Sequence, residues 1–161
     1  MIKKIKKVNV DEIVSEYLKI ENDLEWYDSG HKGKQCGIQY KINENHWMSA
    51  VGKGKGYELG YINLNPFFKD TIFENIISEY NIKRARLMWS GPYSCYSMHT
   101  DSTPRIHIPL ITNKDCYFLF KDSPPQHMEL GYSYWVDTTK YHTFINCSDA
   151  HRLHFIGVVS S

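Results

Sequence analysis

The sequence predicts a mainly β protein, an antiparallel sandwich or jelly-roll barrel with its helices in the N-terminal half. After Asn81, short segments rich in β-branched and aromatic residues follow one another to the C-terminus. Turn-forming residues such as Gly91-Pro92 separate these segments. Apolar residues recur at helical spacing only before Asn81. Short strands at this spacing are typical of antiparallel sandwiches and barrels, in which helices can cover one face of a sheet.

The length and composition fit a single globular domain over residues 1–161. The chain has 161 residues, of which 42% are hydrophobic and 23% are charged, and it contains no internal repeat, low-complexity run or linker. We therefore expect one domain with a helical and loop-rich part over residues 1–80 and a jelly-roll core over residues 81–161.

The charge balance and the hydropathy pattern limit the partners of the chain. A formal net charge of +1 gives no basic field of the kind that non-specific nucleic-acid binding requires. The apolar runs are far shorter than the roughly 18 residues that span a bilayer, and the N-terminus lacks the apolar core of a signal peptide. We expect a soluble, cytoplasmic protein with no nucleic-acid or membrane partner. No CxxC pair occurs, which favours reduced packing thiols at Cys36, Cys95, Cys116 and Cys147.

The chain begins with a basic segment that is followed by an amphipathic helix. Met1–Lys7 carries four lysines and two isoleucines, which favours a solubilising end or an edge strand over a basic arm. Over Val10–Trp26 the apolar residues recur at helical spacing, and Asp11 is placed to cap the first turn.

The next predicted elements are turns, a weak strand, a loop and a second helix. Asp28–Gly37 is rich in turn residues, and Gly37–Ile42 alternates weakly, as a strand does. Gly52–Gly56 alternates glycine and lysine without a helix after it, so it fits a loop better than a phosphate-binding motif. Asp70–Tyr80 has apolar residues at helical spacing and predicts the second helix.

Six strands are predicted after Asn81 because β-branched and aromatic residues dominate each segment and turn signals bound it. The predicted strands are Arg84–Trp89, Arg105–Ile111, Cys116–Phe120, Tyr132–Val136, Tyr141–Asn146 and Arg152–Val159.

Two of these strands place basic residues on one face and apolar residues on the other. Side chains two residues apart share a face of a strand, so Arg105 lies beside His107, and Arg152 lies beside His154. The polar face of an ordinary strand meets water. Two such strands in a jelly-roll barrel instead favour an inner face that lines a cavity for an anion, above all a carboxylate.

A metal site is indicated by His99-Thr100-Asp101, in which an imidazole and a carboxylate two residues apart can reach one ion. His142 is the best third ligand because it opens a later strand, ten residues before Arg152. Two histidines and one carboxylate on one face of an octahedron are typical of non-haem Fe(II) oxygenases. The three open positions can accept a bidentate 2-oxo acid and O2. Arg152 is then suited to pair with the far carboxylate of 2-oxoglutarate.

An ordered set of motifs from Asn81 to the C-terminus, about half of the chain, resembles a known family. The motifs are Arg84-Ala-Arg-Leu-Met-Trp-Ser-Gly-Pro, His99-Thr-Asp101, Arg105-Ile-His-Ile-Pro-Leu110, His142 and Arg152-Leu-His154. They resemble the aspartyl/asparaginyl β-hydroxylase-like branch of the 2-oxoglutarate- and Fe(II)-dependent dioxygenases, and they are also similar to the L-proline cis-4-hydroxylases.

The resemblance implies a double-stranded β-helix, a cupin-like jelly roll, with the N-terminal helices on one face. It implies iron ligation by His99, Asp101 and His142, a contact of Arg152 with 2-oxoglutarate, and support of the cosubstrate by Arg105 and His107. The implied reaction hydroxylates an unactivated C–H bond of an amino acid, or of an Asp/Asn-type side chain in a peptide or protein, and releases succinate and CO2.

Two other functions fit parts of the same pattern. A cupin-like metal- or small-molecule-binding module without oxygenase turnover would retain the barrel but would need no arginine for 2-oxoglutarate. A nucleic-acid-binding barrel would use Met1–Lys7 and the loop at Lys53-Gly-Lys55. Among the other residues, Tyr93 and Tyr96 are candidates for the pocket wall, His154 is a candidate support, and surface positions are expected for His31, His46, His127 and His151.

Overall fold

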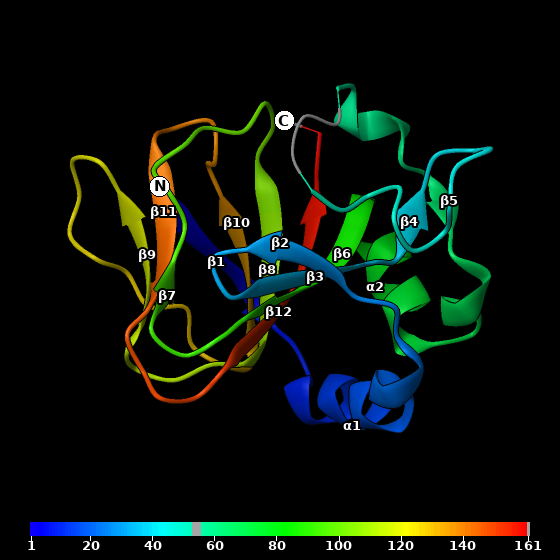
Figure 1. The fold of residues 1–161 in the computed structure, drawn as a ribbon, viewed down its shortest axis with the longest axis horizontal. Coiled ribbons are helices and arrows are strands. Elements are labelled where there is room, and N and C mark those ends of the chain that lie inside the picture. Colours follow the sequence, from blue (N-terminus) through cyan, green and yellow to red (C-terminus); the bar gives the residue numbers. More distant parts are fainter. Residues whose placement is uncertain (53–55, 161) are drawn as a thin grey trace.

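A seven-stranded antiparallel sheet forms the centre of the molecule in a computed structural model that describes residues 1–52 and 56–160 (Figure 1). Its strand order is β1-β10-β8-β12-β6-β3-β2, and every neighbouring pair is antiparallel. The strands span Ile2–Lys7 (β1), Tyr27–Gly30 (β2), Gly33–Gly37 (β3), Lys83–Ser90 (β6), Arg105–Ile111 (β8), Tyr132–Val136 (β10) and Arg152–Val158 (β12).

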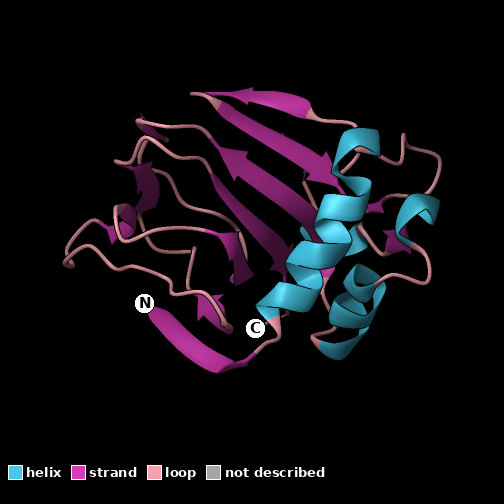
Figure 2. Ribbon diagram, turned by 90° about the horizontal axis from the view of Figure 1, so that it is seen from below, coloured by secondary structure: helices cyan, strands magenta, loops and turns pink. Residues whose placement is uncertain are grey.

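A smaller sheet lies on the side of the main sheet that is opposite to the helices (Figure 2). It has three strands in the order β7-β11-β9, with bounds Ser94–Cys95 (β7), His142–Asn146 (β11) and Cys116–Phe120 (β9). A further pair joins β4, Gln39–Tyr40, to β5, Asn63–Leu64. The helices, the main sheet and the smaller sheet therefore form three layers.

The two α-helices pack on one face of the main sheet. Helix α1, Val10–Ile20, begins after Asn9, whose side chain accepts a hydrogen bond from the backbone N–H of Glu12 at 3.3 Å. The predicted cap, Asp11, lies inside the first turn, so that prediction is wrong. A 3₁₀ turn, η1, follows over Glu21–Asp23, and the helix is therefore shorter than predicted. Helix α2 is Ile72–Glu79, and two more 3₁₀ turns are η2, Glu58–Gly60, and η3, Pro66–Phe68.

The core lies between the helices and the main sheet. Leu87, Ile108 and Phe155, from three neighbouring strands, are fully buried, and the ring of Phe73 on α2 stacks on Phe155 with 6.1 Å between the ring centroids. Because side chains alternate along a strand, the residues between these core positions face the smaller sheet. The predicted mainly β architecture with helices on one face is confirmed.

The six strands predicted after Asn81 are all present, and their ends lie within one residue of the predicted ones. Met1–Lys7 supplies β1, which lies at an edge of the main sheet, as one of its interpretations predicted. Strands from both sides of residue 81 pair within the main sheet, since β1, β2 and β3 join it.

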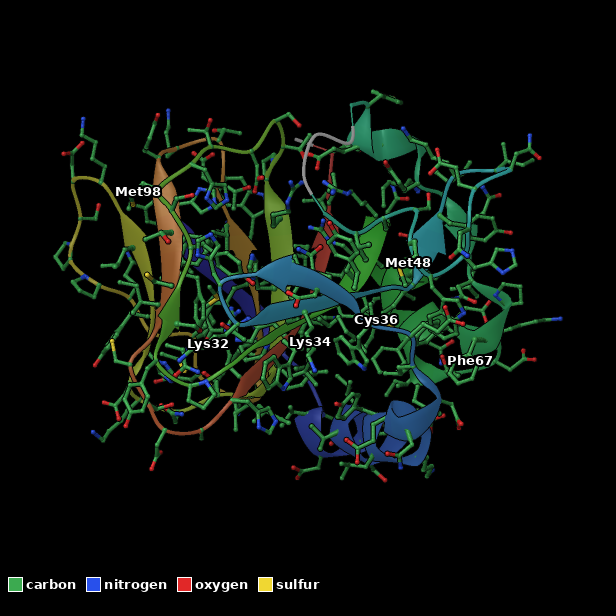
Figure 3. The ribbon with its side chains drawn as sticks, viewed as in Figure 1. Lys32, Lys34, Cys36, Met48, Phe67 and Met98 are labelled. Atoms are coloured by element: carbon green, nitrogen blue, oxygen red, sulfur yellow. The ribbon has the colours of Figure 1, made fainter. Side chains whose placement is uncertain are left out.

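The region predicted as turns over Asp28–Gly37 is in fact the hairpin β2–β3, which adds to the edge of β6. Lys32 and Lys34 lie along this hairpin, with Cys36 further along β3 (Figure 3). At the turn, His31 and Lys32 both have positive φ, as the two central residues of a type I′ turn require. The hairpin escaped prediction because its strands are short and polar. The strand predicted over Gly37–Ile42 is reduced to β4.

The predicted glycine-lysine loop over Gly52–Gly56 has its three central residues, 53–55, outside the described part of the chain. Among the described residues, no helix is long and apolar enough to cross a membrane. The four cysteines are free, with Cys36 and Cys116 buried.

Replacing Leu87 by alanine is expected to destabilise the fold far more than the same change at Leu18. Leu87 is fully buried in the core, whereas Leu18 on α1 is 54% exposed. Leu87→Ala should lower the free energy of unfolding by about 2–5 kcal/mol through lost burial and a residual cavity. Leu18→Ala should change it by less than about 0.5 kcal/mol. Urea denaturation measures both, and equal effects would contradict the placement of the core.

Candidate functional site

A cavity of about 760 Å³ lies between the main sheet and the smaller sheet. This volume is within the range of roughly 300–1,000 Å³ that is usual for small-molecule sites. Main-sheet residues such as Arg86 and His107 line one wall, and Phe118 and Phe144 of the smaller sheet line the other. Parts of the β2–β3 hairpin line it as well, so the cavity uses elements from both halves of the chain.

Three predicted ligands, His99, Asp101 and His142, meet at this cavity. One ligand atom from each can be chosen so that all lie within 4.8 Å of one another, and Nε2 of His142 lies 3.8 Å from Oδ2 of Asp101. The backbone brings them together: His99 and His142 form a β-bridge with two N–H to carbonyl hydrogen bonds of 2.9 Å. The N–H of Asp101 donates to the carbonyl of Thr138 at 2.8 Å.

The side-chain hydrogen bonds orient both imidazoles for metal binding. Nδ1 of His99 lies 2.8 Å from the carbonyl oxygen of Ser97, and Nδ1 of His142 lies 2.8 Å from that of Lys140. A carbonyl can only accept, so each Nδ1 carries the proton and each Nε2 keeps its lone pair. Burial lowers the pKa of His142, which favours the neutral form that a metal requires.

This donor set fits a divalent transition metal. Two neutral imidazoles and a carboxylate suit Fe(II), and the carbonyl partners at Nδ1 are the usual outer contacts of metal-binding histidines. Oδ1 of Asp101 also lies 3.2 Å from Nη2 of Arg105, which fixes the carboxylate from its other side.

Arg152 lies at the cavity wall and is buried, with 3% of its surface exposed. Its Nη2 lies 2.6 Å from Nδ1 of His154, and its guanidinium carbon lies 3.6 Å from the ring centroid of Phe144. Burial lowers the pKa of Arg152 to about 9, so the group remains a cation at neutral pH. Within residues 1–52 and 56–160, its Nε has no hydrogen-bond partner. Arg152 is thus a buried cation with spare donor capacity.

His107 and His154, the two histidines that share strand faces with the predicted cosubstrate arginines, are both buried. Burial, together with the charge of Arg152, keeps the pKa of each well below its usual range, so both are neutral. His107 lines the cavity and meets the ring of Phe118 edge-on. The predicted role of His107 toward the cosubstrate stays a prediction.

Arg105 is paired with a residue that the sequence patterns did not single out. Its Nη1 and Nη2 each donate to a different oxygen of the Glu58 carboxylate at 2.9 Å. Glu58 also accepts hydrogen bonds from Arg84, from Ser102 at 2.8 Å and from Thr103 at 2.7 Å. Arg105 therefore directs its donors to Glu58, Thr103 and Asp101, and its predicted contact with the cosubstrate stays a prediction.

The buried carboxyl of Glu58 is stabilised as an anion. Burial alone would raise its pKa, but the hydrogen bonds and charge of Arg105, with the hydroxyls of Thr103 and Ser102, lower it to about 2. Glu58 begins the short turn η2, and its partners lie 26 to 47 residues further along the chain. No local pattern marks such a residue. Arg84 and Arg86 could have been predicted as cavity residues, because both are basic and lie two residues apart on one strand face.

The remaining candidates separate into cavity residues and surface residues. Tyr96 lines the cavity and its hydroxyl has no hydrogen-bond partner, whereas Tyr93 is 66% exposed and lies outside the lining. His31, His46 and His151 are exposed, as expected for surface positions, whereas His127 is half-buried and its Nδ1 lies 2.9 Å from the carbonyl oxygen of Cys116. None of these four histidines lines the cavity.

The sequence matches the model of one protein family. The model of the family described as aspartyl/asparaginyl beta-hydroxylase matches residues 7–160, nearly the whole chain. No curated protein matches the sequence closely enough to count as a relative.

Several solved structures share the fold at low sequence identity. A 2OG-Fe(II) oxygenase family oxidoreductase from Burkholderia pseudomallei is 13% identical, with a TM-score of 0.59 over 97% of this chain and 84% of that one. A prolyl-4-hydroxylase from Pseudomonas putida is 10% identical, with a TM-score of 0.53 over 98% of this chain and 90% of that one. IDO from Bacillus thuringiensis is 12% identical, with a TM-score of 0.57 over 99% of this chain and 90% of that one. These likenesses confirm the double-stranded β-helix fold.

Neutralising Glu58 is expected to weaken the fold. Glu58→Gln removes the charge that Arg84 and Arg105 share in a buried network, and it should lower the free energy of unfolding at pH 7 by about 3–5 kcal/mol. Glu129→Gln is the matched control, because Glu129 pairs with Lys4 at the surface, and it should cost less than about 1 kcal/mol. Chemical denaturation compares the two variants. Similar losses would mean that the Glu58 network carries no special stability.

The contribution of Glu58 should also depend on pH. Its folded-state pKa lies below the ordinary value of 4.5, so its stabilising effect is present above about pH 4.5 and is lost as the pH falls toward about 2. The difference in unfolding free energy between wild type and Glu58→Gln should therefore shrink over this window. A difference that stays constant with pH would show that the carboxylate charge is not the cause.

Proposed function

The chain belongs to the aspartyl/asparaginyl β-hydroxylase family, and on that premise we propose that it is a 2-oxoglutarate- and Fe(II)-dependent dioxygenase. Its reaction hydroxylates an unactivated C–H bond of an amino acid, or of an Asp/Asn-type side chain in a peptide or protein. The observation that carries the proposal is the meeting of His99, Asp101 and His142 at a cavity that also contains the buried Arg152.

In the proposed enzyme, His99 and His142 would hold Fe(II) through Nε2, and Asp101 would hold it through a carboxylate oxygen. When bound, Fe(II) with 2-oxoglutarate and O2 supplies the oxidising chemistry, with one oxygen atom entering the substrate and the other entering succinate as CO2 leaves. The protein contributes position: Ser97 and Lys140 fix the two imidazoles through Nδ1.

Arg152 holds the distal carboxylate of 2-oxoglutarate in this proposal. Guanidinium and carboxylate form bidentate pairs, and the Nε of Arg152 is free for such a pair. The hydrogen bond to His154 and the contact with the ring of Phe144 hold the guanidinium plane in place. The low dielectric of the buried site strengthens the ion pair relative to one in water.

The apolar side of the cavity excludes water from the reacting groups. Phe118 stacks on His142 with 5.1 Å between the ring centroids, and Phe144 lies against Arg152. Both phenylalanines come from the smaller sheet, which also carries His142 and faces Arg152 on the main sheet. This wall shields the ligand set and the cosubstrate position from solvent on one side.

We further propose that residues 1–161 form a single dioxygenase domain that acts in the cytoplasm on a small-molecule amino acid or a peptide or protein substrate, and that neither nucleic acid nor a membrane is its partner. The single domain is supported by the main sheet, whose strands come from both the first 80 residues and the remainder.

Loss of any metal ligand is expected to abolish the spectroscopic signature of the loaded site. Anaerobic addition of Fe(II) and 2-oxoglutarate to the wild type should give a weak visible charge-transfer band. His99→Ala and Asp101→Ala should lower Fe(II) affinity by more than about 100-fold, beyond the roughly 10–100-fold effect of losing an outer partner. His46→Ala, at an exposed histidine, is the matched control and should keep the band. An unchanged band in His99→Ala would refute the ligand assignment.

Changing Arg152 is expected to affect 2-oxoglutarate and to leave the metal in place. Arg152→Gln should raise the concentration of 2-oxoglutarate needed for half-maximal succinate release by at least about 30-fold, which corresponds to about 2 kcal/mol. Arg152→Lys keeps the charge but loses the bidentate geometry, so its loss should be smaller. Succinate release and Fe(II) binding are measured on the same samples. Intact iron binding without 2-oxoglutarate consumption by the wild type would favour a cupin-like binding module instead.

A further inference from the structure

Arg86 is a buried arginine at the cavity wall with little to bind inside the protein. It is 6% exposed and lines the same cavity as the proposed metal ligands. Its Nη1 donates to the carbonyl of Ala50 at 3.3 Å, and its Nε has no partner among the described residues. A guanidinium has five N–H donors and stays protonated, so burying one without an anion is costly. The guanidinium of Arg86 is therefore suited to bind an anion that enters the cavity.

The cavity concentrates positive charge well beyond the carboxylates available to it. The chain has four arginines, and all four line this cavity, whereas no described lysine does. The only described acidic residues in the lining are Glu58 and Asp101. Glu58 is already engaged by Arg84 and Arg105. Asp101 contacts Arg105 and belongs to the proposed metal site.

Arg86 and Arg152 are placed to bind different groups. On the paired strands β6 and β12, Arg86 lies opposite Ile156, whereas Arg152 lies opposite Ser90, four residues further along β6. At the usual rise per residue, the two backbone positions are roughly 13 Å apart along the strand. Nε of Arg84 and Nη1 of Arg86 both donate to the carbonyl of Ala50, at 3.0 and 3.3 Å, and Arg84 binds Glu58, so Arg86 lies at the Glu58 end of the cavity. Burial and the charges of Arg84 and Arg105 lower the pKa of Arg86, and the charges of Asp101 and Glu58 act in the opposite direction.

In the proposed function, 2-oxoglutarate offers one carboxylate to the metal and the other to Arg152, so neither remains for Arg86. We propose that Arg86 binds a carboxylate of the substrate, and that the enzyme therefore acts on an acid: an amino acid held by its α-carboxylate, or a peptide held by an acidic side chain. This inference rests on the proposed function. The inference makes the proposed function more specific, because it names the substrate group that the cavity recognises.

Two further polar groups are suited to the remainder of such a substrate. The hydroxyls of Ser29 and Tyr96 are buried at the cavity and have no hydrogen-bond partner in the part of the chain that the structure describes. Both lie against Gly33, where an added Cβ would collide with the Tyr96 hydroxyl and meet Ser29 Oγ at 2.8 Å. Ser29 of the β2–β3 hairpin and Tyr96 of the segment after β7 thus bring two hydroxyls to the cavity that contains Arg86, where they can bind the amide or amino groups of a substrate.

The test follows the Nε–Hε resonances of the arginines by NMR in the full-length chain loaded with Zn(II) as a diamagnetic substitute for Fe(II). Arg86→Lys and Arg152→Lys each remove one resonance and so assign the two signals. Addition of 2-oxoglutarate should shift the Arg152 signal and leave that of Arg86 in place. Acetate, added next, should shift the Arg86 signal saturably, and its neutral analogue acetamide should not.

The outcomes separate the inference from the function on which it rests. If 2-oxoglutarate itself shifts the Arg86 signal and acetate adds nothing, Arg86 belongs to the cosubstrate site and the inference is wrong. It is equally wrong if neither compound moves the signal. If 2-oxoglutarate leaves Arg152 unmoved while acetate still shifts Arg86, the proposed function fails and the carboxylate site remains.

A second titration of the same sample distinguishes the two sources of the carboxylate. Glycine offers only an α-carboxylate, and N-acetyl-aspartyl amide offers only a side-chain carboxylate, with N-acetyl-asparaginyl amide as its neutral control. Tighter binding of glycine indicates free amino acids, and tighter binding of the aspartyl compound indicates peptides or proteins. We expect at least a tenfold preference for one source. A shift with acetate but with neither compound would mean an adventitious ion only and would overturn the inference.

Discussion

The alternation of side chains along β6, β8 and β12 determines both the core and the cavity. On these strands, Leu87, Ile108 and Phe155 face the helices, and the residues next to them, such as Arg86, His107 and His154, face the smaller sheet. A slip of one residue in strand pairing would exchange the two faces. It would place an arginine and two histidines against the helices and would put apolar side chains on the main-sheet wall of the cavity. Burial of the core therefore also fixes which side chains face the cavity.

Glu58 makes this arrangement of arginines tolerable. Its carboxylate balances part of the positive charge of Arg84 and Arg105 at the end of the cavity nearest Asp101. The hydroxyls of Ser102 and Thr103 donate to the same carboxylate. Arg105 then contacts Asp101 at 3.2 Å, so the network connects the turn at Glu58 to the proposed metal site. Glu58 thereby helps to position the proposed metal site without being one of its ligands.

The sequence was informative where the fold imposes a local pattern. The strands after Asn81 were predictable because β-branched and aromatic residues dominate them and turn residues bound them. His99 and Asp101 were predictable as a pair because two-residue spacing puts both on one side of an extended segment. The β2–β3 hairpin and Glu58 were not, because their roles depend on partners distant in the chain. Glu58 meets Arg105 across 47 positions, and β3 is held by its pairing with β6. Neither the contact of Glu58 with Arg105 nor the pairing of β3 with β6 produces a periodic pattern in the sequence.

The β-bridge between His99 and His142 also affects how a metal is retained. In the proposed site, two ligands joined by a pair of backbone hydrogen bonds would be ordered before any ion arrives, so binding would not carry the entropy cost of closing the chain between them. A local opening at the start of β11 would break the link between the two histidines. A bound ion would oppose that opening and would slow the exchange of the two bridging amide hydrogens.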